Sequence, residues 1–492
     1  MTPLKRPHSM TLHHLKANMF KPLRLSMHSR TSLTVLAVAA LVACTSPAPY
    51  QRPEVNLPQS WSDGAQLSAD LNPLPWENLY ADIRLRALIR TALERNFDVR
   101  LALASIQESR AIWGIQRADQ LPNVNLGASK TNALTAPYAL GNPGAISVHA
   151  DDVRLSLLSY EIDLWGRVAS LTEAAKLGFQ ATEEDRRALR IGLISDVANA
   201  YFVWLESQDR LRLAELTLQS RQAYLGLTQR RKDLGAASDY DLTLVKASTE
   251  SARAEASALK RQTEQAHNAL IILLGGQWPA NLPDGLPLGL QDLDLAWGAN
   301  LPSEVLLRRP DVMAAEKRLQ AAHANIHAAR VAFLPRLQLT SFIGTSSPAL
   351  GSLFNSPAKE WNFVPTVQMP IFDAGRTAAG VDLAQARQNQ AVVAYEKTLQ
   401  KAFREVSDLL VARDTLKQQL ASLQDILNAQ LERQRLTQSR LEQGSANQLE
   451  WLDAQRDTWQ AEQALDQVRR QLLGTTAQLY KALGGGELQS NR

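Results

Sequence analysis

The apolar residues of this chain recur with two different periods. In two long stretches they return every three or four positions, which is the spacing of a packed helical seam. The clearest runs are Ile191, Ile194, Ala198, Tyr201 and Leu205, and later Leu399, Phe403, Val406 and Leu410. The pattern predicts four long helices, over residues 171–233, 239–274, 380–442 and 447–483.

Two pairs of shorter segments alternate apolar and polar residues, as half-buried strands do. Gly- and Pro-rich stretches separate the two members of each pair, so we expect loops there. The strands are expected to start near Val124, Ser147, Leu337 and Trp361. A helical pattern that ends in Leu-Pro precedes each pair, over residues 77–120 and again from Asp311.

The order of these elements repeats along the chain as helix, strand, strand, long helix, long helix. Both halves also close with the same Leu-Gly-Gly sequence. We therefore expect an internal duplication of mixed α and β structure that is mainly α. The expected divisions are a signal peptide (1–43), an N-terminal tether (44–76), a first repeat (77–276), a linker (277–300), a second repeat (301–486) and a short tail (487–492).

The two long helical hairpins are expected to have matching tips. The stretch 227–241 reappears, shifted by 209 positions, as the stretch 436–450. In both copies Gly and other small residues interrupt the helical pattern, and Gly can end a helix in a left-handed conformation. The capping boxes expected to start the next helices are Ser238 with Asp241 and Asn447 with Glu450.

Elements of this kind need partners outside a single chain. A 63-residue helix such as 171–233 would be roughly 95 Å long, too long to bury its apolar stripe in an ordinary globular core. Four alternating strands leave unpaired edges and an apolar face. Within a membrane only a closed barrel removes such edges, and four strands are too few to close one of the usual size. The pattern therefore favours an oligomer, with a barrel in an outer membrane and a helical tube below it.

The first 43 residues differ in composition from the rest of the chain. They carry six of the 53 basic residues and none of the 49 acidic ones, so the remainder has 47 basic residues and a net charge of −2. The apolar run from Leu33 to Ala43 is too short to span a bilayer but fits the core of a signal peptide. The overall charge of +4 therefore gives no case for a nucleic-acid surface.

Cys44 is the only cysteine and directly follows this apolar run. The sequence Leu41-Val42-Ala43-Cys44 resembles a bacterial lipoprotein processing site, with cleavage before Cys44 and acylation of its sulfur and new N-terminus. The alternative is an ordinary signal peptide with an incidental cysteine. Thr45, in place of Asp, is by the same resemblance typical of the outer membrane. The covalent lipid on Cys44 is the only cofactor that we expect.

No pattern of catalytic or metal-binding residues is evident in the sequence. His323 and His327 are four residues apart, but Ala324 stands where the zinc-protease motif needs Glu. The Gly-rich ends of the two halves do not fit the phosphate-loop pattern, and no GxSxG elbow is present. We therefore expect neither an enzyme nor a metal site.

Six motifs spread over the mature chain are typical of one family. They are residues 115–122 (IQRADQLP), 160–167 (YEIDLWGR), 307–312 (LRRPDV), 370–376 (PIFDAGR), 452–456 (LDAQR) and 479–486 (LYKALGGG). With them the chain resembles the TolC-like outer-membrane efflux proteins, in the acylated branch that serves resistance-nodulation-division multidrug pumps.

The resemblance implies a homotrimer. Each subunit would give four strands to a twelve-stranded outer-membrane β-barrel and its long helices to a periplasmic α-helical barrel. The trimer would be a passive exit duct of a tripartite efflux system and would expel drugs or other small toxic compounds. A periplasmic adaptor and an inner-membrane pump would dock at the periplasmic tip, and the pump would supply the energy.

The resemblance also implies a gate at that tip. By family pattern, acidic residues at Glu450 and Asp453 line the constriction and Arg440 helps to latch it, while Asp241 is the matching acid of the first tip. Leu244 stands where the first half would match Asp453, so this acid has no counterpart. Threefold symmetry would make Asp453 a ring of three like charges. The alternative roles are helix capping and solvated ion pairs.

The small and basic residues of the two tips are candidates for contact with the adaptor, because small residues let another helical hairpin approach closely. They are Arg231, Gly235, Ala237, Gly444 and Ala446. The alternative is that they only set the geometry of the tips. Two other functions stay open, namely a duct for metal-ion or type I protein export and a lipid-anchored periplasmic coiled-coil structural or adaptor protein. The strand pairs at equivalent points of both halves argue against the second.

Overall fold

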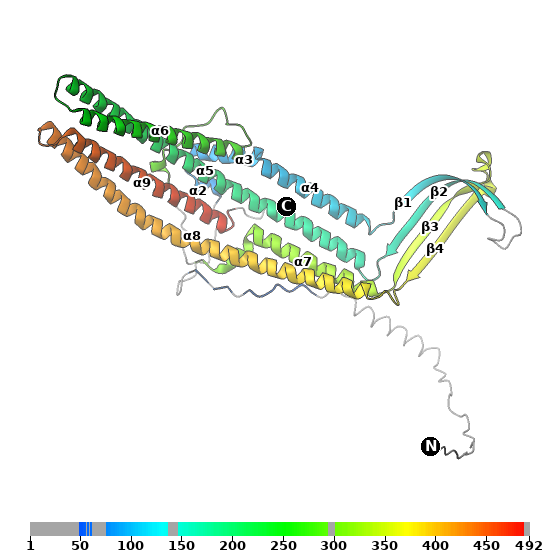
Figure 1. The fold of residues 1–492 in the computed structure, drawn as a ribbon. Coiled ribbons are helices and arrows are strands. Elements are labelled where there is room, and N and C mark those ends of the chain that lie inside the picture. The colour runs from blue at the N-terminus through cyan, green and yellow to red at the C-terminus, as the bar shows by residue number, and fades with distance from the viewer. Residues whose placement is uncertain are drawn as a thin grey trace, which may run out of the picture. The chain divides into compact units, whose positions relative to one another are not determined.

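The computed structural model describes residues 49–55, 57–58, 60–61, 75–135, 146–293 and 301–486. The signal peptide, Cys44 and the tail at 487–492 lie outside the described residues, so the lipidation of Cys44 stays a prediction. Residues from Pro49 onward form one compact unit. Figure 1 shows its long helices and its group of four strands.

Helices make up most of this unit. They are α2 (Trp76–Leu79), α3 (Ile83–Arg95), α4 (Phe97–Ala118), α5 (Arg167–Asp233), α6 (Asp239–Leu273), α7 (Pro310–Arg330), α8 (Arg376–Glu442) and α9 (Gln448–Ala482). Short 3-10 turns are η1 (Leu288–Leu290), η2 (Ser303–Arg308), η3 (Val331–Phe333), η4 (Leu350–Ser352) and η5 (Ser356–Ala358). The four predicted long helices are confirmed to within four residues at each end. α5 and α8 each have 67 residues and α6 and α9 each have 35, so the two hairpins match in length.

The single helix expected over residues 77–120 is wrong. The carboxylate of Asp82 accepts hydrogen bonds from the amides of Arg84 and Leu85, and the side chain of Asn96 accepts from the amides two and three residues after it. Each of these side chains satisfies the free amides of a new helix start. Three separate helices, α2, α3 and α4, therefore replace the predicted one.

Two related turns start α5 and α8 a few residues earlier than predicted. Gly166 and Gly375 precede the helices with φ of 73° and 83°. An aspartate just before each glycine caps the new helix, since Asp163 accepts from the amide of Ala169 at 2.8 Å and Asp373 accepts from that of Thr377 at 2.9 Å. These turns lie in two of the family motifs and connect a strand directly to a long helix.

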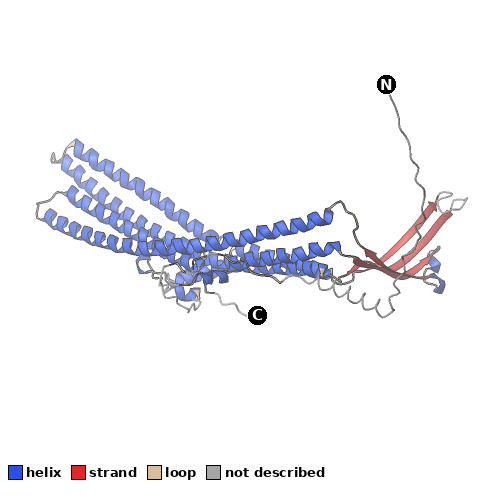
Figure 2. Cartoon of the chain, turned by 90° about the horizontal axis from the view of Figure 1, so that it is seen from below, coloured by secondary structure: helices blue, strands red, loops and turns tan. Residues whose placement is uncertain are grey.

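The strands form one antiparallel sheet in the order β1-β2-β3-β4. Their bounds are β1 (Val124–Thr135), β2 (Ile146–Ile162), β3 (Arg336–Ser347) and β4 (Lys359–Gln368), all starting within two residues of the predicted positions. β2 of the first half pairs with β3 of the second half, so the sheet joins the two repeats. Figure 2 shows the strands beyond the ends of the helices rather than packed onto them.

The sheet has one apolar and one polar face. Residues paired across neighbouring strands point to the same face. Leu155 pairs with Leu126 and with Ile343, and Ile343 pairs with Trp361. One register position away, the pairs join Gly127, Arg154, Gly344 and Glu360. The apolar side chains are exposed, with 76% of Leu126 and 76% of Trp361 accessible, so this face lacks a cover within the part of the chain that the structure describes.

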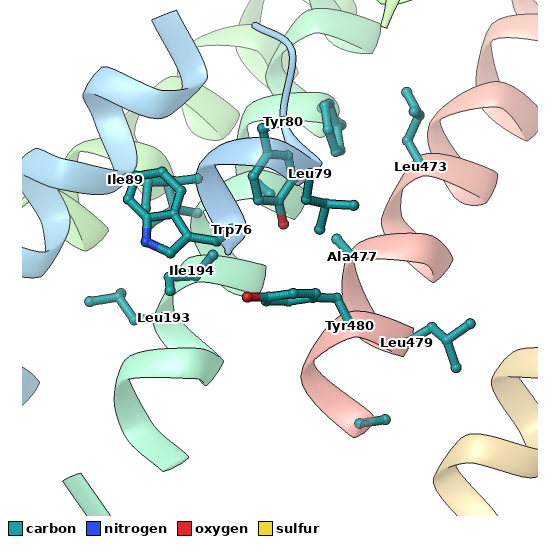
Figure 3. Close-up of a cluster of buried hydrophobic side chains, with 14 of the residues drawn as sticks. Trp76, Leu79, Tyr80, Ile89, Leu193, Ile194, Leu473, Ala477, Leu479 and Tyr480 are labelled. Carbon is teal, nitrogen blue, oxygen red and sulfur yellow. The ribbon is translucent and has the colours of Figure 1, made fainter. Parts of the chain in front are cut away.

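α5 is the central helix of the unit and packs against α3, α4, α6, α7 and α9. It holds the one stretch, among the described helices, that is apolar and long enough to cross a membrane, but 61% of that stretch is buried inside the protein. In Figure 3 Trp76 of α2, Ile194 of α5, and Ala477 and Tyr480 of α9 meet in the main core. The core therefore also ties the first repeat to the second.

The described part of the N-terminal tether is bound to the helices. The guanidinium of Arg52 donates to both carboxylate oxygens of Glu316 on α7, at 2.8 and 2.9 Å. Trp61 stacks on Phe403 of α8 at 5.3 Å between ring centroids and donates its indole N–H to the carbonyl of that residue. The segment thus fastens the chain across α7 and α8.

Candidate functional site

The tips of the α5–α6 and α8–α9 hairpins have the same backbone geometry. After each long helix a glycine adopts the left-handed conformation, with φ of 72° at Gly235 and 71° at Gly444. The amide after the glycine donates to the carbonyl five residues earlier, at 2.7 Å in the first tip and 2.9 Å in the second. Both helices therefore end as the glycine pattern predicts.

In the first tip, Asp241 completes a capping box with Ser238. Its amide donates to the Ser238 hydroxyl at 3.1 Å, and its carboxylate accepts from the Ser238 amide at 3.1 Å and from the Ser238 hydroxyl at 2.7 Å. The hydrogen bonds from Ser238 lower the pKa of the Asp241 carboxyl. Lys232 and Asp239 form an ion pair that joins the two helices of the same tip. The capping box predicted at Ser238 is confirmed.

In the second tip, the predicted capping box is only half formed. The side chain of Asn447 accepts from the Glu450 amide at 2.8 Å. Among the described residues, however, the Asn447 amide does not donate to the Glu450 carboxylate. That carboxylate lies 3.9 Å from the guanidinium of Arg440, which also donates to the Ser445 carbonyl at 3.1 Å. Glu is longer than Asp, and the cation on α8 draws the Glu450 carboxylate away from the cap. The structure thus brings together two of the predicted gate residues, Arg440 and Glu450.

Asp453 belongs to a second group of charges, one helical turn further along α9. Its carboxylate lies 3.2 Å from the guanidinium of Arg456, which also contacts Asp457 at 2.8 Å. Asp457 in turn lies 2.8 Å from Arg433 on α8. The predicted gate residues therefore do not form one cluster, because Arg440 contacts Glu450 whereas Asp453 contacts Arg456.

Arg221 of α5 is a residue near the tip that the sequence analysis missed. It is buried, and its guanidinium approaches the carbonyl of Leu452 on α9 at 3.5 Å. Burial lowers the pKa of Arg221, and the nearby carboxylate of Asp453 opposes that shift. The neighbouring Ser220 donates to Gln455 at 2.8 Å. The first hairpin is therefore joined to the second beside Asp453.

A difference in sequence between the two repeats marks this junction. At the shift of 209 positions, Thr249 and Thr458 match, and each donates its hydroxyl to the equivalent carbonyl of the preceding helix. The charges at the junction have no match, because Arg221 corresponds to Gln430, Asp453 to Leu244 and Arg456 to Ala247. Charges that break an internal repeat therefore mark the place where the two hairpins meet.

The interface between α5 and α9 continues away from the tips as a row of ion pairs. Glu206 accepts from Arg470 at 2.8 Å, and Arg212 lies 3.6 Å from Glu462. Asp466 is buried in this row and pairs with Arg469 at 3.0 Å. Burial raises the pKa of Asp466 to about 6; Arg469 opposes the shift, and the carboxylates of Asp209, Glu462 and Glu206 add to it. Asp466 therefore lies among several other carboxylates in this row, and Arg469 is its ion-pair partner.

The residues predicted to contact the adaptor lie at the accessible ends of the hairpins. Arg231, Gly235 and Gly444 are exposed, and Ala237 and Ala446 are half-buried. A Cβ atom added at Gly235 or Gly444 would meet no atom within 4 Å, so the space around both glycines is open. Their contact with an adaptor stays a prediction.

The two histidines at 323 and 327 have separate contacts. His327 bonds to the carbonyl of Trp165 through Nε2 at 3.0 Å, and His323 faces Gln388 at 3.2 Å. Within the described ranges, no three His, Cys, Asp or Glu side chains are placed so that they could hold a metal ion.

Comparison with known proteins identifies the family. Residues 88–276 and 301–485 each match the model of the family "Outer membrane efflux protein". The outer membrane protein OprJ of Pseudomonas aeruginosa is 40% identical over 459 residues, which are 92% of this chain and 95% of OprJ. The toluene efflux pump outer membrane protein TtgC of Pseudomonas putida is 38% identical over 464 residues, covering 92% of this chain and 96% of TtgC.

Among solved structures, the open state of the Neisseria gonorrhoeae MtrE outer membrane channel is similar with a TM-score of 0.79 and 36% identity. This likeness covers 90% of the present chain and 98% of MtrE. Together with the duplicated hairpins and the two-faced sheet, these similarities show that the chain belongs to the outer membrane efflux protein family.

Proposed function

We propose that three copies of this chain form the outer-membrane exit duct of a tripartite pump that expels small toxic compounds. The observation that carries the proposal is the sheet, which has an exposed apolar face, a polar face and two free edges, and is continuous with long helical hairpins. A membrane channel that continues into a helical tube needs this combination of elements.

The sheet can close only with other copies. β1 and β4 are the edge strands, and within a bilayer an unpaired edge is costly, so each edge pairs with the opposite edge of a neighbouring subunit. The strands have 10 to 17 residues, and about 9 to 11 residues suffice for a tilted strand to cross a membrane. Three copies would give a barrel of twelve strands with the apolar face toward lipid and the polar face toward the channel.

The long helices then place the tips at the periplasmic end of the duct. There the Arg440–Glu450 pair joins α8 to α9, and Arg221 joins the first hairpin to the second beside Asp453. Three copies of Asp453 around the axis would form an acidic ring that favours cations and narrows the opening. Opening the duct would require these contacts to be broken.

The proposed partners come from the family resemblance. The exposed residues of the two tips would receive a periplasmic adaptor, and the adaptor would connect the duct to an inner-membrane pump of the resistance-nodulation-division class. The channel is passive, and the pump supplies the energy. Because TtgC is named for toluene efflux, we propose small organic toxicants as the cargo.

A strain lacking the protein tests this function. It should accumulate organic toxicants and become sensitive to them, and a plasmid copy of the wild-type gene should restore resistance. Phe363→Arg, on the apolar face, should fail to restore it, because an Arg facing the lipid costs about 2–4 kcal/mol at the middle of the bilayer.

Asn362→Arg is the matched control for this test, because Asn362 is adjacent in β4 but points to the polar face. It should restore resistance as the wild type does. Unchanged accumulation of every compound tested in the deletion strain, under conditions in which the parent strain makes the protein, would contradict the proposed function.

A further inference from the structure

A cavity of about 520 Å³ lies against α7, near the N-terminal ends of α5 and of α8. Four arginines line it, together with an apolar wall that includes Leu171 and Leu383; the arginines are Arg167, Arg318, Arg336 and Arg387. Among the described residues, its lining contains no acidic side chain. Its volume lies within the range of sites that enclose small organic ligands, about 300 to 1,000 Å³.

Two of the four guanidinium groups are neutralised by carboxylates. Arg167 donates to both oxygens of Glu161, at 2.8 and 2.7 Å, and Arg318 forms an ion pair with Asp185. Arg336 and Arg387 make no ion pair with any residue that the structure describes. The Glu161 carboxylate lies near enough to Arg336 to attract its charge, but no ion pair with a described residue holds Arg336 or Arg387, so both guanidinium groups can bind an anion. The planar fork of a guanidinium matches a carboxylate, sulfonate or phosphate group.

The register of the sheet shows to which face the Arg336 wall of this cavity belongs. Arg336 starts β3 and pairs with Gln368, one position from the apolar pair of Leu337 with Val367. Arg336 thus belongs to the polar face of the sheet, as does Glu161, which pairs with Gln338. Since the apolar face is the one that meets lipid, Arg336 lies on the interior side and not among lipid headgroups.

We propose that this cavity binds amphipathic organic anions, that is, compounds with an apolar body and a carboxylate or sulfonate group, as they pass through the duct. The apolar body would lie against Leu171 and Leu383, and Arg336 and Arg387 would hold the anionic group. The proposal rests on the proposed function, because the assignment of the polar face to the channel interior comes from it.

Calorimetric titration of the purified full-length protein in phosphatidylcholine nanodiscs tests the cavity, with naphthalene-1-sulfonate as the probe. The wild type should bind the sulfonate, and the double variant Arg336→Gln/Arg387→Gln should bind it at least tenfold more weakly. Arg336→Lys/Arg387→Lys keeps the charges and should stay within severalfold of the wild type. Neutral naphthalene-1-methanol should not distinguish the wild type from the double variant.

Arg404→Gln is the matched control, because Arg404 is an exposed arginine of the same helix, α8, and does not line the cavity. It should leave the affinity for the sulfonate unchanged. Equal affinity of the wild type and the double Gln variant, or an equal loss in Arg404→Gln, would overturn the proposal.

A second titration decides the source of the anion. In nanodiscs that contain phosphatidylglycerol, sulfonate binding should be as strong as in phosphatidylcholine. Competition by the anionic lipid would show that the cavity faces headgroups and would overturn its assignment to the channel interior. Potassium chloride conductance of the double Gln variant, measured separately, should persist. Absence of conductance from the wild type would contradict the duct itself, whereas the titration alone decides on the cavity.

Discussion

At the scale of single residues, the two tips use equivalent acidic side chains differently. Asp241 closes a capping box on Ser238, whereas Glu450 at the matching position faces Arg440. The first tip therefore uses its acid for local helix stability, and the second has a charge pair between its two helices. A pair of this kind can open without unwinding α9, because Asn447 caps that helix independently.

This difference predicts unequal effects of removing the two acids. Asp241→Ala should make the first-turn amides of α6 exchange with solvent about threefold faster, since it removes the hydrogen bonds from Ser238 to the Asp241 carboxylate while Ser238 stays the N-cap. Glu450→Ala should change exchange in the first turn of α9 less than twofold. Hydrogen–deuterium exchange of the two tips measures both effects, and equal acceleration in the two tips would contradict the assignment.

Asp466 makes a second prediction, on pH dependence. Its pKa is about 6 in the folded protein, against an ordinary value of 3.8. The folded state therefore binds more protons between pH 3.8 and pH 6, so the contribution of Asp466 to stability falls as the pH rises through this window. When the pKa of a group is one pH unit higher in the folded than in the unfolded state, the loss amounts to about 1.4 kcal/mol.

Asp466→Asn should consequently melt at a higher temperature than the wild type at pH 7.5. The advantage should fade as the pH falls below 6 and become small near pH 4. Melting temperatures of the two proteins at pH 7.5 and pH 4.5 check this. An advantage that is the same at both values would mean that Asp466 does not titrate in the interface of α5 with α9.

The residue scale is also where the sequence predicted least. The cap at Ser238 depends on local spacing and could be predicted. The contact of Glu450 with Arg440 and the burial of Arg221 against α9 depend on how separate helices pack against one another. Local spacing contains no information on which of two competing partners a long side chain will take.

At the scale of elements, the hydrophobic period predicted the hairpins closely. The seams of α5 and α8 face partner helices along their length, and the glycines end the helices where the sequence indicates. The helix over 77–120 was mispredicted because Asp82 and Asn96 each cap the start of a new helix within an otherwise continuous apolar pattern. A capping residue can therefore divide a helix even where the spacing of apolar residues continues unchanged, and periodicity alone does not reveal such a division.

The tip glycines make a prediction at this scale. Gly444→Val and Gly235→Val each put a side chain on a backbone with positive φ, which costs at least about 1–2 kcal/mol, while a Cβ atom at either position meets no atom within 4 Å. Each variant should fold and reach the outer membrane in normal amounts. Each should lose its association with the adaptor, measured by crosslinking in cells.

Gly178→Ala is the control for both variants, because Gly178 lies within α5, away from the tip, and also has open space for a Cβ atom. It should associate with the adaptor as the wild type does. Normal association of the two Val variants would show that the tip glycines set only the local turn and do not contact the adaptor.

At the scale of the whole molecule, the account depends on assembly. One chain supplies a four-stranded sheet with an uncovered apolar face and two free edges. The alternation of residues predicted the strands and their faces, and the shortage of strands predicted an oligomer. The number of copies came from family resemblance, because no feature of one chain states how many neighbours close the barrel.

Native mass spectrometry of the protein released from membranes should therefore give three copies. A predominant monomer or dimer under conditions that preserve β-barrels would contradict the proposed closure. Phe363→Arg should shift the population toward unassembled chain, and Asn362→Arg should not.

Planar-bilayer recording measures directly whether the chain forms a duct that charges at its periplasmic tip hold closed. We predict ion conductance from the purified wild-type protein with a preference for cations. The variant Asp453→Asn/Arg440→Gln should conduct severalfold more and with less preference for cations, because the acidic ring and the pair with Glu450 are removed. Absence of any conductance from both the wild type and this variant would contradict the account.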